Sequence, residues 1–225
     1  MIKDNKMKKQ IIIAVCSLIS LSAFAQEQQE QSHWSVQVRG GITKSFVSVE
    51  DPDYEKGRLG WTLGAEAEYK FSKHFSLTGG LEYTRLSRKK GCTIFPFFGG
   101  TLYDRFKIYS DYVHIPVLLN YYVVKGLALK VGVEMGILTH AKRKIHSFRN
   151  GDEDSPFDTR MTEDIYSLMS KGDILFPIGI SYEYNNVVLD ARYHHGVKNI
   201  RLPYYFESRP HNRYLSVTLG YKFDL

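Results

Sequence analysis

The feature that most constrains the fold is a strict alternation of apolar and polar residues over residues 59–83. In residues 59–71 every second side chain is apolar, a period of two that only an extended strand sorts onto two faces. Residues 72–74 interrupt the alternation, which then resumes over 75–83, so the two runs predict a β-hairpin. Each run is about long enough to cross a bilayer as a tilted strand, which takes roughly 9–11 residues. A soluble antiparallel sheet would alternate in the same way, so the hairpin alone leaves both readings open.

Eight runs of this kind are predicted along the chain. They cover residues 34–46, 59–71, 75–83, 108–122, 127–140, 174–184, 187–195 and 213–225. Short connections at 72–74, 123–126 and 185–186 alternate with long ones at 47–57, 88–107, 141–173 and 196–212. An even strand number with short turns at one end and long loops at the other is typical of outer-membrane barrels. A soluble up-and-down barrel has no physical reason to separate its loops in this way. We therefore predict an all-β, eight-stranded antiparallel up-and-down transmembrane β-barrel with short periplasmic turns and long extracellular loops.

The N-terminus has the charged, apolar and small-residue pattern of a secretory signal peptide. Lys8 and Lys9 precede the apolar run 11–21, and Ala23 and Ala25 indicate cleavage after residue 25. We expect residues 26–225 to form a single barrel domain in the outer membrane of a Gram-negative bacterium. Loss of four lysines and one aspartate would lower the formal net charge from +6 to about +3, which is no nucleic-acid footprint. Cys92 would remain as the only cysteine, so no intramolecular disulfide is predicted.

The polar face of the predicted strands carries charges of both signs. Its basic residues are Arg39, Lys70, Lys130, Arg192 and Lys222, and its acidic residues are Glu66, Glu68, Glu82, Glu134, Glu183, Asp190 and Asp224. We expect an interior charge network formed by Arg39, Glu66, Glu68, Glu82, Lys130, Glu134, Asp190 and Arg192. Because eight strands leave room only for side chains, the bore is predicted to be closed. A small channel stays open as an alternative.

Two segments give the chain a resemblance to a known family. Residues 112–121 read Tyr-Val-His-Ile-Pro-Val-Leu-Leu-Asn-Tyr, which resembles the tyrosine-x-glutamate-isoleucine-proline-leucine-leucine strand of the PorT-like outer-membrane β-barrel family. His114 stands where that family usually carries a carboxylate. The C-terminal residues Thr218, Gly220, Phe223 and Leu225 match the last-strand signal that the barrel-assembly machinery recognises. The resemblance implies a structural or partner-binding role, with participation in protein secretion or surface assembly.

Two predicted loops carry candidate contact residues. The basic residues Lys142, Arg143, Lys144 and Arg149 are interpreted either as contacts to lipopolysaccharide phosphates or an acidic partner, or as a solvated loop start. Phe95, Phe97 and Phe98 belong to an apolar loop that either covers the barrel mouth or meets a partner. Residues 161–170 suggest a short helix in the third long loop.

Catalysis is the remaining function class. Some eight-stranded barrels are lipid-modifying enzymes, so His194 and His195 are the histidines to weigh against that alternative. A catalytic histidine requires a hydroxyl nucleophile and an orienting acid within hydrogen-bond reach, and no serine lies two residues from this pair. We predict no catalytic residue, no metal and no cofactor.

Overall fold

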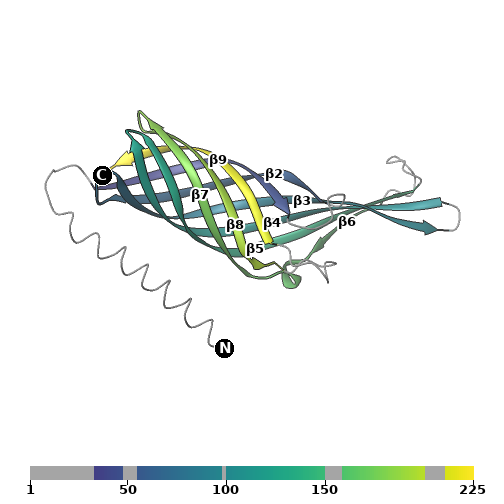
Figure 1. Ribbon diagram of the computed structural model, residues 1–225. Coiled ribbons are helices and arrows are strands. Elements are labelled where there is room, and N and C mark those ends of the chain that lie inside the picture. The colour runs from purple at the N-terminus through teal and green to yellow at the C-terminus, as the bar shows by residue number, and fades with distance from the viewer. Residues whose placement is uncertain (1–32, 48–54, 98–99, 150–158, 201–210) are drawn as a thin grey trace, which may run out of the picture.

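The computed structural model describes residues 33–47, 55–97, 100–149, 159–200 and 211–225, and these form nine strands and one short helical turn (Figure 1). The strands are β1 (Trp34–Val47), β2 (Glu55–Lys70), β3 (Phe75–Phe97), β4 (Gly100–Val124), β5 (Leu127–Arg149), β6 (Thr159–Asp164), β7 (Gly172–Tyr184), β8 (Val187–Asn199) and β9 (His211–Asp224). A 3-10 turn, η2, covers Tyr166–Leu168. The expected signal peptide lies outside the described residues.

Eight of the strands close into a ring. The order β4-β3-β2-β1-β9-β8-β7-β5 is completed by pairing between β4 and β5, and all neighbours are antiparallel. The first and last ring strands, β1 and β9, therefore lie side by side (Figure 1). The ninth strand, β6, pairs with β5 beyond the ring. The predicted eight-stranded barrel is confirmed.

One end of the ring, the turn end, holds three short connections. Gly126 adopts a φ of 85° in the turn between β4 and β5, and Asn185 and Asn186 adopt φ of 47° and 66° between β7 and β8. Two consecutive residues with positive φ make a turn whose twist matches that of the flanking strands, and asparagine tolerates this conformation better than most residues. Strand β1 begins and β9 ends at the turn end, and the opposite end is the loop end.

The alternation predicted from the sequence sorts the side chains onto an apolar outer wall and a polar interior. On β1, Val38 is 51% exposed and its neighbour Arg39 is 1% exposed. The same pattern recurs on β5, where Val131 and Val133 face outward and Lys130 and Glu134 are buried. A continuous apolar outer surface of this extent is unfavourable in water and is expected where lipid surrounds the protein. The described residues include no helix that is both apolar enough and long enough to cross a bilayer.

The predicted loop 88–107 is wrong. Strands β3 and β4 continue through it, with pairing from Lys89 opposite Lys107 to Phe97 opposite Gly100, so that a long hairpin projects beyond the ring (Figure 1). Strand β5 likewise continues to Arg149 within the predicted loop 141–173. These extensions leave the ring and lose the single apolar face, so the period-two signal that identifies the other strands is absent from them. The short helix predicted at 161–170 is present only as the 3-10 turn η2, because β6 occupies the first part of that segment.

Candidate functional site: the filled bore and the basic outer face

The lowest layer of the bore, near the turn end, centres on Lys222. Its Nζ lies 2.7 Å from Glu68 Oε2 and 2.9 Å from Glu183 Oε2. Glu68 Oε1 also accepts hydrogen bonds from the hydroxyls of Ser76 and Tyr122, each at 2.5 Å. Five strands, β2, β3, β4, β7 and β9, thus send one polar side chain each into the same layer. Their charge-assisted bonds close this end of the bore.

The middle layer is an ionic cluster around Glu66. Arg192 donates to both carboxylate oxygens of Glu66, at 2.6 and 2.9 Å, and Arg39 Nη1 donates to Glu66 Oε1 at 2.7 Å. Asp190 accepts from Arg192 Nη2 at 2.9 Å and lies 2.8 Å from Lys130 Nζ. These five side chains are almost completely buried. Buried charges are tolerated only when they are paired, and here each has at least one partner of opposite sign.

Glu82 connects this layer to the next one. Its Oε2 lies 3.7 Å from Arg39 Nη1, and its Oε1 accepts a hydrogen bond from the Thr62 hydroxyl at 2.6 Å. The structure therefore places the eight residues of the expected interior network inside the bore, spread over successive layers. Glu68 lies in the layer below the middle layer, where it bonds to Lys222. Glu134 lies in the layer above, where it bonds to His194.

The third layer is a hydrogen-bonded chain that ends on Glu134. His194 Nδ1 donates to Glu134 Oε2 at 3.0 Å, and His194 Nε2 lies 2.9 Å from the Ser216 hydroxyl. Tyr214 donates to the other oxygen of Glu134 at 2.8 Å, and its ring stacks on His194 with a centroid distance of 4.0 Å. His114 Nδ1 lies 3.4 Å from Glu134 Oε1.

An apolar cap covers the bore at the loop end. Strand residues Leu86, Ile108, Leu138 and Leu175 pack with Ile165, Met169 and Ile200 from the segments that follow β6 and β8. The structure places only the backbone of part of the predicted cover, Phe95 to Phe98. Phe95 and Phe97 lie on the projecting part of β3, their side chains are not described, and Phe98 lies outside the described residues. Ile165, Met169 and Ile200 therefore contribute to the cap from outside the ring strands.

The four basic residues predicted near 142–149 do not share a face. Lys142 and Lys144 are exposed on the outer face of β5. Arg143 points the other way, is buried, forms an ion pair with Glu163 of β6, and lies over the Phe106 ring with its guanidinium 5.6 Å from the centroid. Arg149 is the last residue of β5, and its side chain is not described. Strand alternation separates these residues, whereas the predicted loop would have left them together.

A comparison with protein-family models identifies the chain. The model described as outer membrane protein β-barrel domain matches residues 24–201. The chain belongs to this family of outer-membrane β-barrels. Its turn end is accordingly periplasmic and its loop end extracellular, as in barrels of this type. The search of curated proteins gave no match.

Solved structures similar to this outer-membrane barrel include those of Ail, Neisserial surface protein A and OprG. The attachment invasion locus protein Ail of Yersinia pestis, in complex with the heparin analogue sucrose octasulfate, is 16% identical, with a TM-score of 0.48 over 85% of this chain and 99% of Ail. Neisserial surface protein A is 16% identical, with a TM-score of 0.41 over 86% and 98%. OprG from Pseudomonas aeruginosa is 12% identical, with a TM-score of 0.39 over 88% and 100%.

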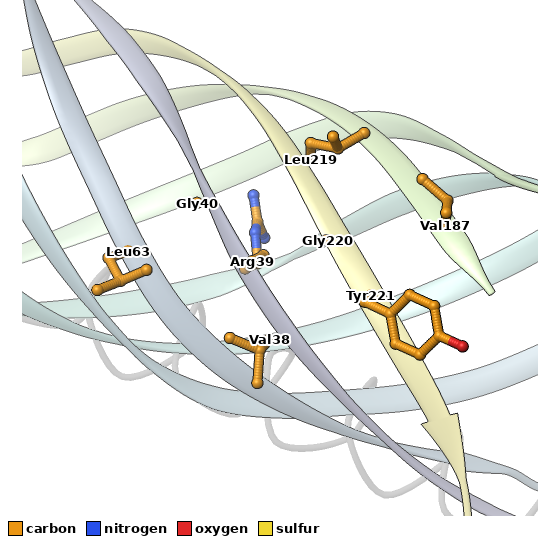
Figure 2. Close-up of a pocket in the computed structure, with 8 residues that line it drawn as sticks. All are labelled: Val38, Arg39, Gly40, Leu63, Val187, Leu219, Gly220 and Tyr221. Atoms are coloured by element: carbon orange, nitrogen blue, oxygen red, sulfur yellow. The ribbon is translucent and has the colours of Figure 1, made fainter.

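The lipid-facing wall of this outer-membrane barrel has a groove at Gly40. Leu219, Gly40 and Leu63 are register neighbours across β9, β1 and β2, and the missing side chain at Gly40 leaves a hollow between the two leucines (Figure 2). Val38 and Tyr221 complete its apolar walls, while the Arg39 side chain is buried inside the barrel. The groove offers lipid chains an apolar surface and brings no reactive side chain to them.

Sequence reasoning missed the chain of Ser216, His194 and Glu134. No serine lies two residues from the histidine pair, and Ser216 is on a different predicted strand with no paired histidine motif. In the structure that strand is the neighbour of β8, with Arg192 opposite Ser216 and His194 opposite Tyr214. The strand register carries this signal and the linear spacing does not. In the described residues no cluster of three or more histidine, cysteine, aspartate or glutamate side chains is arranged to hold a metal ion.

Proposed function

We propose that this outer-membrane barrel is a closed, non-conducting scaffold that presents its extracellular sheet to a partner, as an accessory of protein secretion or surface assembly. The observation that carries the proposal is the filled bore. Three polar layers and an apolar cap occupy it from the periplasmic turns to the extracellular end. A barrel whose interior is filled by fixed ion pairs has no path for a solute. Its function therefore lies on its surfaces.

The extracellular extension of β3, β4, β5 and β6 supports this reading. These strands continue the barrel wall well beyond the lipid-facing region as a paired sheet (Figure 1). A rigid, hydrogen-bonded extension holds side chains in fixed positions, which lowers the entropy that a partner must overcome on binding. Lys142 and Lys144 lie on its outer face and remain our candidates for contact with lipopolysaccharide or an acidic partner. Arg149 at the end of β5 and Phe95 and Phe97 on β3 remain candidates as well, as does Phe98, which lies outside the described residues.

The PorT-like resemblance supports an assembly role and belongs to the proposal. In residues 112–121, the side chains of Tyr112, His114, Leu118 and Asn120 are buried in the bore. The motif therefore builds the interior. His114, in the position where that family usually carries an acid, faces Glu134, so this barrel places its carboxylate on the neighbouring strand β5.

The C-terminal signal has two separate roles in the proposal. Thr218 and Gly220 face the bore, where Thr218 accepts a hydrogen bond from Arg39 at 2.7 Å. Phe223 and Leu225 are exposed on the outer wall at the periplasmic end. We assign the aromatic and terminal apolar side chains to recognition by the barrel-assembly machinery, because they alone of the four are accessible from outside.

Single-channel recording tests the closed bore. Purified protein in planar bilayers is expected to give no steady conductance steps over ±100 mV. The matched variant Arg39→Ser/Glu66→Ser removes one cation and one anion from the middle layer without changing net charge, and is expected to leak more than the wild type. Large ohmic steps from the wild type would overturn the proposal and favour a channel.

A hydrolase is the second candidate, because Ser216, His194 and Glu134 have the order of a serine, histidine and acid triad. Ser216 and His194 are fully buried, and Glu134 nearly so. A serine with no accessible face cannot attack a substrate, so we assign the chain a structural role. A fluorophosphonate probe is expected to leave the folded wild type unlabelled. Labelling that Ser216→Ala abolishes would establish the enzyme.

A further inference from the structure

Three lysines stand side by side on neighbouring strands of the extracellular extension. Lys89 of β3 is the register partner of Lys107 on β4, and Lys107 is the partner of Lys144 on β5. We call these three residues the lysine rung. Because neighbouring strands lie about 4.8 Å apart, the rung spans roughly 10 Å across the sheet. The register continues on the far side, where Lys56 of β2 is the partner of Lys89.

The lysine rung belongs to the outer face of the sheet. One strand neighbour of each lysine is buried on the inner face: Arg88 beside Lys89, Ile108 beside Lys107 and Arg143 beside Lys144. Lys144 Nζ lies 5.6 Å from the centroid of the Tyr109 ring, which is on the same outer face of β4. The ammonium groups therefore point sideways, above the lipid that surrounds the barrel, and not into the bore.

The surroundings of the lysine rung are also basic. One step further out along the sheet, His146 is the register partner of both Arg105 and Arg160. One step towards the membrane, Lys142 is exposed and has Asp164 as its register partner. Asp164 also accepts a hydrogen bond from the backbone N–H of Tyr166 at 2.8 Å, which holds it at the end of β6.

Like charges placed directly opposite one another on adjacent strands destabilise a sheet. A bound polyanion would reduce the mutual repulsion of the three lysines of the rung. Phosphate groups satisfy lysine ammonium groups through charge-assisted hydrogen bonds. The spacing of the rung matches a ligand that carries more than one phosphate within about 10 Å.

The height of the lysine rung above the lipid-facing wall distinguishes a phospholipid headgroup from a larger phosphorylated headgroup as the source of the phosphate. On β5 the last outward apolar residue of the wall is Ile137, and Thr139 forms a bulge before Lys144. About six strand steps at 3.3 Å and a tilt near 40° put Lys144 roughly 15 Å above Ile137. The headgroup layer of a phospholipid is only about 5–7 Å deep in each leaflet. A phosphorylated saccharide headgroup extends further and reaches this level.

We propose that the lysine rung binds the phosphate groups of a phosphorylated glycolipid headgroup, lipopolysaccharide, in the leaflet around the barrel. This inference rests on the proposed function in taking the extended sheet as a binding surface, but it does not depend on a closed bore. A barrel that conducts ions but binds lipopolysaccharide through the lysine rung would refute the closed bore and leave the lipopolysaccharide site standing.

The test is a titration of the full mature protein, purified in a zwitterionic detergent, with lipopolysaccharide. Lys107→Glu/Lys144→Glu is expected to lower the affinity about tenfold or more, because it replaces two cations of the rung with anions. Lys125→Glu is the matched control, since it changes an exposed lysine at the periplasmic end of the same two strands, and it is expected to change the affinity less than twofold. Lys107→Gln/Lys144→Gln removes the charge without adding an anion and is expected to weaken binding severalfold. A heat-shifted band in unboiled gels confirms that each variant is folded.

Three further ligands identify the source of the phosphate. Dephosphorylated lipopolysaccharide and phosphatidylglycerol are expected to bind at least tenfold more weakly than intact lipopolysaccharide. Raising the salt concentration from 50 to 500 mM is expected to lower the affinity for intact lipopolysaccharide. Equal affinity of the wild type and the folded glutamine variant would overturn the site. Phosphatidylglycerol binding as strongly as lipopolysaccharide would overturn the height argument. Binding of inositol hexakisphosphate without binding of lipopolysaccharide would assign the rung to a soluble polyanion and overturn the glycolipid.

Discussion

Arg192 and Glu66 form a two-bonded ion pair across the bore, with Nη1 to Oε1 at 2.6 Å and Nη2 to Oε2 at 2.9 Å. Their strands β8 and β2 are not neighbours, because β1 and β9 lie between them in the ring. The pair therefore braces the barrel across its interior, and Arg39 of β1 shares the same carboxylate.

Glu66→Ala is expected to destabilise the barrel strongly. It leaves Arg39 and Arg192 buried with less compensating charge, and removal of one partner of a buried pair costs about 3–5 kcal/mol. Urea unfolding of the reconstituted protein, followed by tryptophan fluorescence, measures this loss. Lys73→Ala, in the exposed periplasmic turn, is the control and is expected to change the free energy of unfolding by less than about 0.5 kcal/mol. Equal stability of the two variants would show that the ionic layer does not hold the ring together.

Val131→Arg tests which face of the barrel meets lipid. Val131 lies in the middle of β5 on the outer wall, and an arginine at the bilayer midplane costs roughly 2–4 kcal/mol. Thr78→Ser, on the inner face of β3, keeps a hydroxyl for its neighbour Asn120 and is expected to cost much less. Folding yields into liposomes give the comparison, and equal tolerance at both positions would contradict a lipid-facing outer wall.

Gly40→Ala and Gly41→Ala are adjacent changes with opposite expected results. A Cβ on Gly41 would lie 2.1 Å from the backbone oxygen of Val217 and 2.6 Å from Thr218 Cα, so the seam between β1 and β9 must move apart. We expect a loss of about 1–3 kcal/mol, the usual cost of overpacking. A Cβ on Gly40 meets the flexible end of Leu63 at 3.3 Å and the backbone oxygen of Thr62 at an ordinary contact distance of 3.6 Å, and it partly fills the outer groove. Thermal unfolding midpoints are expected to fall for Gly41→Ala and to stay near the wild-type value for Gly40→Ala, and a larger fall for Gly40→Ala would be inconsistent with this packing.

Cysteine labelling on intact cells tests the orientation. In a Cys92→Ser background, Thr162→Cys on exposed β6 is expected to react with a membrane-impermeant maleimide. Lys73→Cys, in the turn between β2 and β3, is expected to react only after the cells are broken. The reverse pattern would place the short turns outside.

The fold was predictable because lipid and bore impose opposite demands on alternate residues. The pattern on β5 is enough to identify a strand with one face in lipid and the other in the bore, because Val131 and Val133 alternate with Lys130 and Glu134. The extracellular extension was missed for the same reason, since the sequence of residues 89–97 shows no alternation of apolar and polar residues. Strand pairing there depends on contacts with β4 that are distant in sequence.

The interior residues could be identified from the sequence, but their partners could not. The alternation of inward and outward side chains along each strand places Glu66, Glu134 and His194 in the bore. Which side chains they contact there depends on strand tilt and stagger. Glu134 contacts His194 of β8 and Tyr214 of β9, although β7 lies between β5 and β8. The lysine rung likewise becomes visible only when the register of β3, β4 and β5 is known.

The hydrogen bond from Arg39 Nη2 to Thr218 Oγ1 joins residues 179 positions apart, across the seam where β1 meets β9. Contacts this distant in sequence form late, because the intervening chain must first be arranged at an entropic cost. Until the two chain ends meet, Arg39 and Glu66 face water through the open side of the sheet. Pairing of β1 with β9 and dehydration of the bore are therefore one kinetic step.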